Sequence, residues 1–186
     1  MNKLLLIVAL FAINCRAQTN VINLTETDQH NLNKLDGSLY MKDLNNLMTP
    51  YIGTWTWTSG NKEMTLLLIK QTKYHYNSGQ NYYKDRIVGS YIYKENGIIK
   101  ADTSNDNLND EYVKVIFSLN PSFKINSLAF YDYLKKKDYD VWLELISPTQ
   151  MKFHGKEDTD ITKYRRGTHT IYPGKTFPLE MTFTKQ

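Results

Sequence analysis

Apolar and polar residues alternate along most of the chain after residue 50, as expected for β-strands with one face in a core. The cleanest example is Phe177–Lys185, whose odd-numbered residues are apolar up to Phe183. A second run, Glu63–Lys73, is apolar on both faces and is expected in the middle of a sheet. The remaining predicted strands are Ile52–Thr58, Tyr82–Tyr93, Ile98–Ala101, Tyr112–Leu119, Ser127–Tyr133, Tyr139–Ile146 and Gln150–His154.

Turn residues separate these runs. Glu95-Asn96-Gly97 is the strongest hairpin signal, because Asn-Gly adopts the tight turn that joins antiparallel strands. Polar stretches at Asp102–Asp110 and Gly155–Lys175 predict longer loops. The fold class is therefore mainly β: an antiparallel meander that forms a lipocalin-like barrel or a strongly curled sheet.

One helix is predicted near the N-terminus, over Leu39–Met48. Ser38 can cap it, its apolar residues recur at helical spacing, and Pro50 ends it. The preceding stretch, Thr19–Lys34, is rich in Asn, Thr and Asp and has no periodicity. We therefore expect a flexible tether over 18–37 and a single β domain over 38–186.

The first residues have the pattern of an export signal. Lys3 provides a positive charge and Leu4–Ile13 an apolar segment too short to span a bilayer as a stable helix. Residues 1–17 are therefore expected to be a signal peptide. The expected location is outside the cytoplasm: the periplasm, the outer membrane as a lipoprotein, or the medium.

Cys15, the single cysteine, directly follows the apolar segment and leaves two maturation routes open. Cleavage after Ala17 would remove it, whereas cleavage before it would leave an acylated cysteine as the only attachment to a membrane. Asn14 stands where lipoprotein signals prefer a small residue. On either route the folded domain has no disulfide and no thiolate chemistry.

Charge argues against a nucleic-acid partner. Without Lys3 and Arg16 the 23 basic residues fall to 21 against 19 acidic ones, which leaves a net charge of +2. The short basic clusters at 135–137 and 163–166 lie near aspartates and suit solvated turns better than a nucleic-acid surface.

Two segments carry a family resemblance. Tyr40–Trp55, which ends in Tyr-Ile-Gly-Thr-Trp, and Tyr83–Tyr91 resemble an uncharacterised family of small exported proteins of Bacteroidota type. Members share a short signal that ends near Cys-x-Ala-Gln, as Cys15–Gln18 does here. This resemblance covers most of the chain and implies no activity.

Gly53-Thr54-Trp55 also resembles the Gly-x-Trp that opens the first strand of lipocalin-like barrels. This second resemblance covers a handful of residues, and the late helix typical of those barrels is not evident. It implies a barrel and carries no information on a ligand.

Signatures of catalysis are missing: the chain has no Gly-x-Ser-x-Gly, no His-Glu-x-x-His, no glycine-rich phosphate loop and no Cys/His metal spacing. His154, Glu157, Asp158, Asp160 and His169 share one loop that suits a solvated turn better than a metal or acid–base site. The oxygen-rich segment Asn105–Glu111 lacks the spacing of a calcium loop. We therefore expect a protein that is not an enzyme and has no cofactor and no metal.

Asp85 is the most informative polar residue, because alternation places it on the apolar side of its strand. A carboxylate there needs either a charged partner or a wet cavity. If a cavity exists, Asp85, Tyr91, Trp55 and Trp57 are its expected lining. The direction of Trp142 is left undecided by its apolar neighbours.

Two functions are compatible with these observations. The first is a barrel that holds a small lipophilic ligand, which requires an interior cavity. The second is a module with a filled core that engages a cell-envelope protein through its surface.

Overall fold

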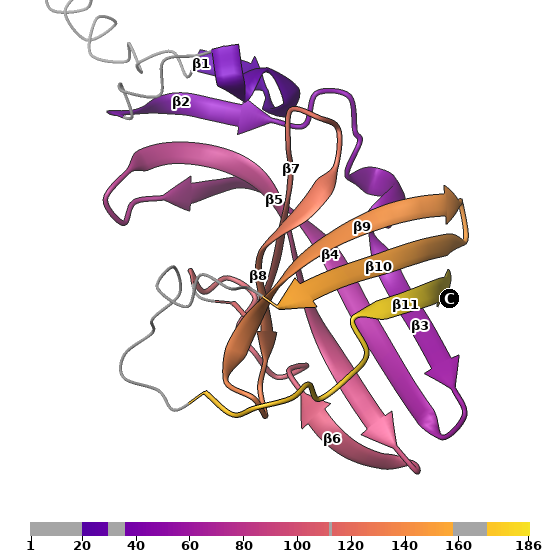
Figure 1. Cartoon of the computed structure of the whole chain (residues 1–186). Helices are drawn as coiled ribbons and strands as arrows, with labels where there is room; N and C mark the ends of the chain where they lie inside the picture. Colours follow the sequence, from indigo (N-terminus) through magenta and orange to yellow (C-terminus); the bar gives the residue numbers. More distant parts are fainter. Residues whose placement is uncertain (1–19, 30–35, 112, 158–170) are drawn as a thin grey trace, which may run out of the picture.

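Eleven β-strands form a single sheet in the computed structural model, which describes residues 20–29, 36–111, 113–157 and 171–186 (Figure 1). Two short 3₁₀ turns accompany them, η1 (Leu24–Gln29) and η2 (Thr49–Tyr51). The strands are β1 (Asn20–Asn23), β2 (Asp36–Lys42), β3 (Gly53–Ser59), β4 (Lys62–Tyr76), β5 (Asn81–Glu95), β6 (Ile98–Asp102), β7 (Val115–Leu119), β8 (Ile125–Asp132), β9 (Lys137–Ser147), β10 (Gln150–Glu157) and β11 (Glu180–Lys185).

Eight of these strands close into an antiparallel barrel. Their order is β5-β4-β3-β11-β10-β9-β8-β7, and the pairing of β7 with β5 closes the ring. The predicted mainly β, antiparallel architecture is confirmed, and the barrel is closed. Closure leaves the eight strands without a free edge.

Strand β5 holds the additional strands. β4 pairs with one edge of β5, while the other edge meets β2 at its start, β7 in its middle and β6 at its end. β1 then adds to β2 in a parallel pair. As a result β1 and β2 lie beside the curled ends of β4 and β5, outside the barrel (Figure 1).

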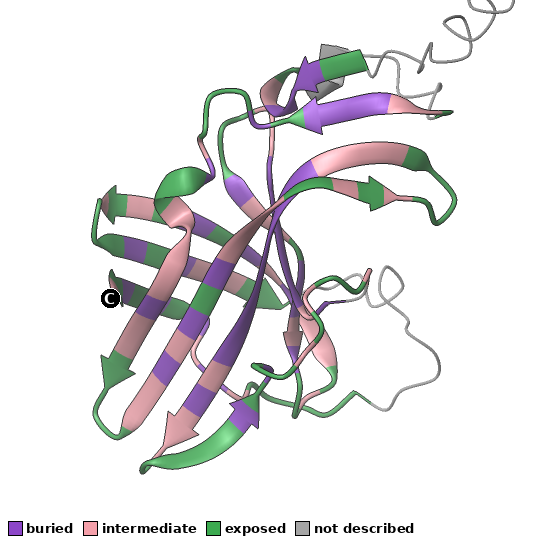
Figure 2. Cartoon of the chain, turned by 180° about the vertical axis from the view of Figure 1, so that it is seen from behind, coloured by how far each residue is buried: buried purple, intermediate pink, exposed green. Residues whose placement is uncertain are grey.

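Burial follows the alternation of the sequence (Figure 2). The predicted inward residues of the last segment, Phe177, Leu179, Met181 and Phe183, are all buried. β4 likewise buries Met64, Leu66 and Leu68 completely. Each strand thus contributes one apolar face to a common interior.

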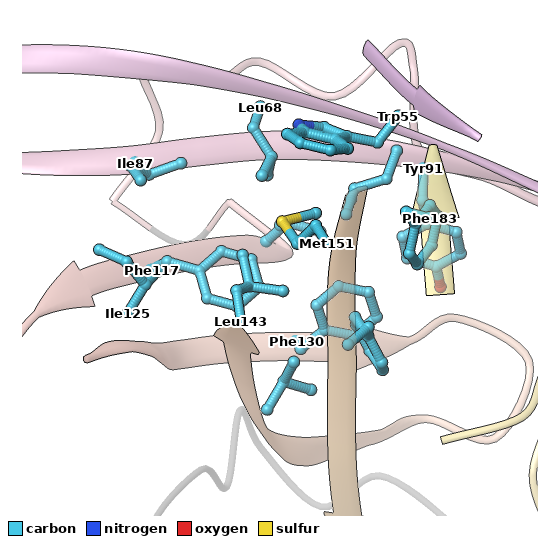
Figure 3. Close-up of a cluster of buried hydrophobic side chains, with 14 of the residues drawn as sticks. Trp55, Leu68, Ile87, Tyr91, Phe117, Ile125, Phe130, Leu143, Met151 and Phe183 are labelled. Carbon is cyan, nitrogen blue, oxygen red and sulfur yellow. The ribbon is translucent and has the colours of Figure 1, made fainter. Parts of the chain in front are cut away.

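All eight barrel strands contribute side chains to that interior (Figure 3). Phe130 is at its centre, with ring centroids of Tyr91, Phe117, Phe153 and Phe177 between 4.9 and 6.1 Å away. The rings meet at mixed stacked and edge-on angles, which are the favourable arrangements for aromatic pairs. The barrel interior is therefore packed with side chains.

The hairpin predicted at Glu95-Asn96-Gly97 joins β5 to β6. Asn96 and Gly97 have φ angles of 54° and 72°, as a tight hairpin turn requires. We expect Gly97→Ala to lower the free energy of unfolding by about 1 kcal/mol, because a side chain is strained at this φ. Urea denaturation measures the change, and Lys100→Ala on exposed β6 is the control. Equal effects of the two substitutions would contradict the turn geometry.

The predicted helix over Leu39–Met48 is wrong. The first part of that segment forms the end of β2, where Leu39, Tyr40 and Met41 are buried in succession. Leu44, expected on the buried face of the helix, is 50% exposed. Backbone pairing with β1 and β5 prevails over the local helical spacing.

The flexible tether expected over 18–37 is also wrong where the structure describes it. Asn20–Asn23 pairs with β2, and Ile22 and Leu24 are buried against the core. Only Asn23 separates these two apolar residues, and so short a segment gives no periodic pattern. Residues 30–35 and the predicted signal peptide lie outside the described residues.

Candidate functional site

Trp55, the first residue expected to line a cavity, is fully buried in β3. Its indole Nε1 donates a hydrogen bond to the Tyr51 carbonyl over 2.8 Å, and the Lys185 ammonium lies 5.1 Å from its ring centroid. Trp57, two residues along the same strand, is half-buried and packs at the margin of the core. Both indoles act as packing groups of the barrel.

Tyr91 is buried to the same degree on β5. Its hydroxyl donates to the Tyr131 carbonyl over 2.8 Å and accepts the Tyr133 backbone N–H over 3.2 Å. Burial raises the pKa of Tyr91 well above its usual value, so the phenol stays neutral. The hydroxyl fixes the turn after β8.

Asp85 accepts bonds from three different segments. Its Oδ1 accepts the Tyr40 hydroxyl at 2.6 Å and the Lys73 backbone N–H at 2.9 Å, and its Oδ2 accepts the Asp43 N–H at 3.1 Å. The Lys70 ammonium lies 3.9 Å from the same Oδ2. Of the two predicted alternatives, a charged partner or a wet cavity, the structure shows the charged partner, and the carboxylate joins β2 and β4 to β5.

Asp43 is the second buried carboxylate of this cluster, and the sequence did not reveal it. Its Oδ2 lies 2.8 Å from the Lys70 ammonium, and its two oxygens accept the N–H groups of Leu47 and Met48. Burial, and then the hydrogen bond to Asp85, raises the pKa of Tyr40. The cluster holds the turn after β2 in the place where a helix was predicted.

Asp85 and Tyr91 do not share a site. They are six residues apart on one strand, and a strand rises about 3.3 Å per residue, so about 20 Å separates them. Packed side chains fill the space between the candidate lining residues.

The described candidate metal ligands of the two loops make structural contacts. Asp106 pairs with Lys114 at 2.7 Å, and the backbone carbonyl of Asp110 accepts from buried Arg86, so the Asn105–Glu111 segment covers the outer face of β5. Of the other loop, Asp158, Asp160 and His169 lie outside the described residues. Glu157 forms an ion pair with Lys137 at 3.3 Å. Within the described ranges no group of His, Cys, Asp or Glu side chains is arranged to hold a metal ion.

A cleft of about 320 Å³ opens in the outer wall of the barrel between β8 and β9. The two strands pair at Asn126 and Trp142 and again at Tyr131 and Asp138, with a shift of register between these points. Within the shift, Ser127 Oγ accepts the Val141 N–H at 2.8 Å and donates to the Tyr139 carbonyl at 3.3 Å. The Ser127 side chain thus replaces backbone pairing and holds the strands apart.

The cleft combines an aromatic ring with polar groups of both charges. Its lining consists of Lys124, Asn126, Ser127, Asp140, Val141, Trp142 and Lys156. Lys156 and Asp140 form an ion pair at 3.4 Å. The amide oxygen of Asn126 is buried and has no hydrogen-bond partner among the described residues.

Trp142 is 37% exposed and faces outward, which settles the direction left open by the sequence. Its indole stacks on the His154 ring with centroids 4.9 Å apart. His154 Nδ1 and Nε2 lie 2.9 and 3.3 Å from carboxylate oxygens of Glu180 and Glu144. A row of cross-strand pairs therefore supports Trp142 from the side of β10.

The cleft could not be predicted from the sequence. The direction of Trp142 stays open in the sequence, because the indole and its neighbours Val141 and Leu143 are all apolar. The break in pairing between β8 and β9 leaves no local signal in the sequence, because the register of the two strands joins residues that are distant along the chain.

Comparison with known proteins gives a family and no activity. No helix in the described ranges is long and apolar enough to cross a membrane. No curated protein and no solved structure matches the chain. A family model matches residues 1–186, and the chain thus belongs to DUF6705, a family of unknown function.

Proposed function

We propose that this protein is an exported, non-enzymatic binding module with a structural interior, which recognises a component of the cell envelope through the cleft in its outer wall. The observation that carries the proposal is the contrast between the two sides of the wall. The inside is packed with rings around Phe130, while the outside has an open cleft with an exposed indole.

The packed interior favours this function over a carrier of lipophilic molecules. Pockets for small molecules usually have volumes of about 300–1,000 Å³, and a carrier would need such a volume inside the barrel. Trp55, Tyr91 and Phe130 fill the centre of the barrel, and the polar atoms of the first two already bond to backbone carbonyls. A lipophilic ligand would have to displace these side chains.

The shifted pKa values support a non-catalytic role. Those raised most strongly belong to Tyr40, Tyr91 and Tyr139, and burial is the first cause in each case. Tyr40 and Tyr139 donate to buried carboxylates, and Tyr91 donates to a backbone carbonyl. The hydroxyl groups of these three tyrosines are therefore engaged in structural hydrogen bonds.

Export is the second part of the proposal and depends on the pattern of residues 1–17. An intact mass of protein recovered from the native host identifies the first residue of the mature chain. A chain that begins at an acylated Cys15 is a lipoprotein, and one that begins at Gln18 is periplasmic or secreted. A chain that retains residues 1–17 would contradict export.

Native mass spectrometry of gently purified protein tests the binding function. We expect a non-covalent adduct on the wild type that Trp142→Ala abolishes. Leu67→Ala is the matched control, because Leu67 is also 37% exposed and lies on β4, four strands away around the ring. Three results would contradict binding at the cleft. They are a wild type without an adduct, an adduct that Trp142→Ala retains, and loss of the adduct in both variants.

A further inference from the structure

The orphaned oxygen of Asn126 limits what the cleft can bind. A buried acceptor without a partner costs about 1–3 kcal/mol, so a matching ligand presents a hydrogen-bond donor to it. A hydrocarbon chain has no such donor, and a fully ionised carboxylate or phosphate has none either. A ligand that satisfies this oxygen therefore carries a hydrogen-bond donor, such as a hydroxyl or an amide.

Trp142 adds a flat apolar surface. His154 stacks against the indole at an interplanar angle of 13° and holds its orientation. An indole fixed in this way suits the apolar face of a ring-shaped ligand. The volume of about 320 Å³ is at the small end of ligand pockets, which points to one or two rings.

Charge supplies the third constraint. Lys156 shares its charge with Asp140, and both side chains are about half exposed or more. Lys124, at the other side of the cleft, forms no ion pair with any described residue, so the lining carries one uncompensated positive charge. A ligand with one negative charge complements this lining best.

We propose that the β8–β9 cleft binds a uronic acid, a sugar ring that carries one carboxylate. The ring lies on Trp142, and the carboxylate pairs with the Lys124 ammonium. A ring hydroxyl donates to Asn126 Oδ1 once the Asn126 side chain, whose oxygen is buried in the unliganded protein, turns toward the cleft. The proposal rests on the proposed function, and it names the class of envelope component: an acidic saccharide, either free or as a residue of a polysaccharide.

Calorimetric titration of the mature protein with glucuronate tests this proposal, with glucose and acetate as comparisons. We expect glucuronate to bind, glucose to bind about tenfold more weakly for want of the charge pair, and acetate not to bind. Lys124→Met is expected to reduce the affinity for glucuronate to that for glucose and to leave glucose unchanged. Lys156→Met, the control on the paired lysine, is expected to have a smaller effect.

Asn126→Leu separates binding from folding. The substitution removes an unpaired acceptor, so we expect unchanged or higher stability together with loss of binding of both sugars. The proposal would be overturned if the wild type does not bind glucuronate, or if it binds glucuronate and acetate equally well. Full binding by Asn126→Leu would also overturn it. A nucleoside monophosphate that binds more tightly than glucuronate would overturn it as well.

Failure of this inference is distinguishable from failure of the proposed function. If the native adduct depends on Trp142 and glucuronate does not bind, the cleft is a binding site for another class of ligand. If the native adduct is unaffected by Trp142→Ala, the proposed function itself fails.

Discussion

Replacement of Asp85 by asparagine is expected to lower the free energy of unfolding by about 3–5 kcal/mol, the usual cost of breaking a buried ion pair. Every group within reach of the Asp85 oxygens is a donor: the Tyr40 hydroxyl, the Lys73 and Asp43 N–H groups, and the Lys70 ammonium. The NH₂ group of an asparagine would face at least one of these donors, and both groups would then lack an acceptor.

Urea denaturation of the variant measures this effect. Glu63→Gln on β4 is the control, because Glu63 pairs with Lys94 at 2.9 Å in an ion pair that is more than a third exposed on both sides. The control is expected to cost about 1 kcal/mol or less. Similar losses in the two variants would show that the Asp85 cluster does not hold β2 and the following turn to the barrel.

Removal of the Phe130 ring is expected to have an effect of similar size. Phe130→Ala should cost about 3–5 kcal/mol, because the ring contacts four other aromatic side chains and its loss leaves a cavity at the centre of the barrel. The cavity is lined by apolar groups, so we also expect the variant to take up benzene.

Leu128→Ala is the matched control for Phe130→Ala. It lies two residues earlier on β8 but is 39% exposed, so its loss should be small. Thermal unfolding with and without benzene measures both effects, and stabilisation by benzene is expected in Phe130→Ala alone. Stabilisation of the wild type by benzene would show that the interior already contains free space.

The strands were predictable because the local alternation of apolar and polar residues indicates which side chains are buried. Phe177–Phe183 and Met64–Leu68 alternate as a strand with one buried face does, and Asn96-Gly97 marks its turn locally. No information from distant parts of the chain is needed for these assignments. The alternation also placed Asp85 on the apolar side of its strand, where a carboxylate needs a charged partner or a wet cavity, and the structure shows the charged partner.

Elements whose structure depends on distant contacts were mispredicted. Residues 39–48 have a helical spacing of apolar positions, but Tyr40 pairs with Tyr83 and bonds to Asp85, more than 40 residues away. β1 has four residues and is too short to give a signal. The cleft is hidden for the same reason, because it arises where β8 and β9 shift register around Ser127.

We propose that binding takes place at the outer wall and that the interior is structural. The chain has three tryptophans, and each reports on a different place: Trp55 in the core, Trp57 at its margin and Trp142 in the cleft. Nuclear magnetic resonance of their indole N–H groups during titrations with glucuronate and with palmitate follows all three at once. We expect glucuronate to shift the Trp142 signal alone and palmitate to shift none of the three. A saturable shift of Trp55 with palmitate, with Trp142 unmoved by glucuronate, would contradict binding at the outer wall and show that the interior takes up a ligand.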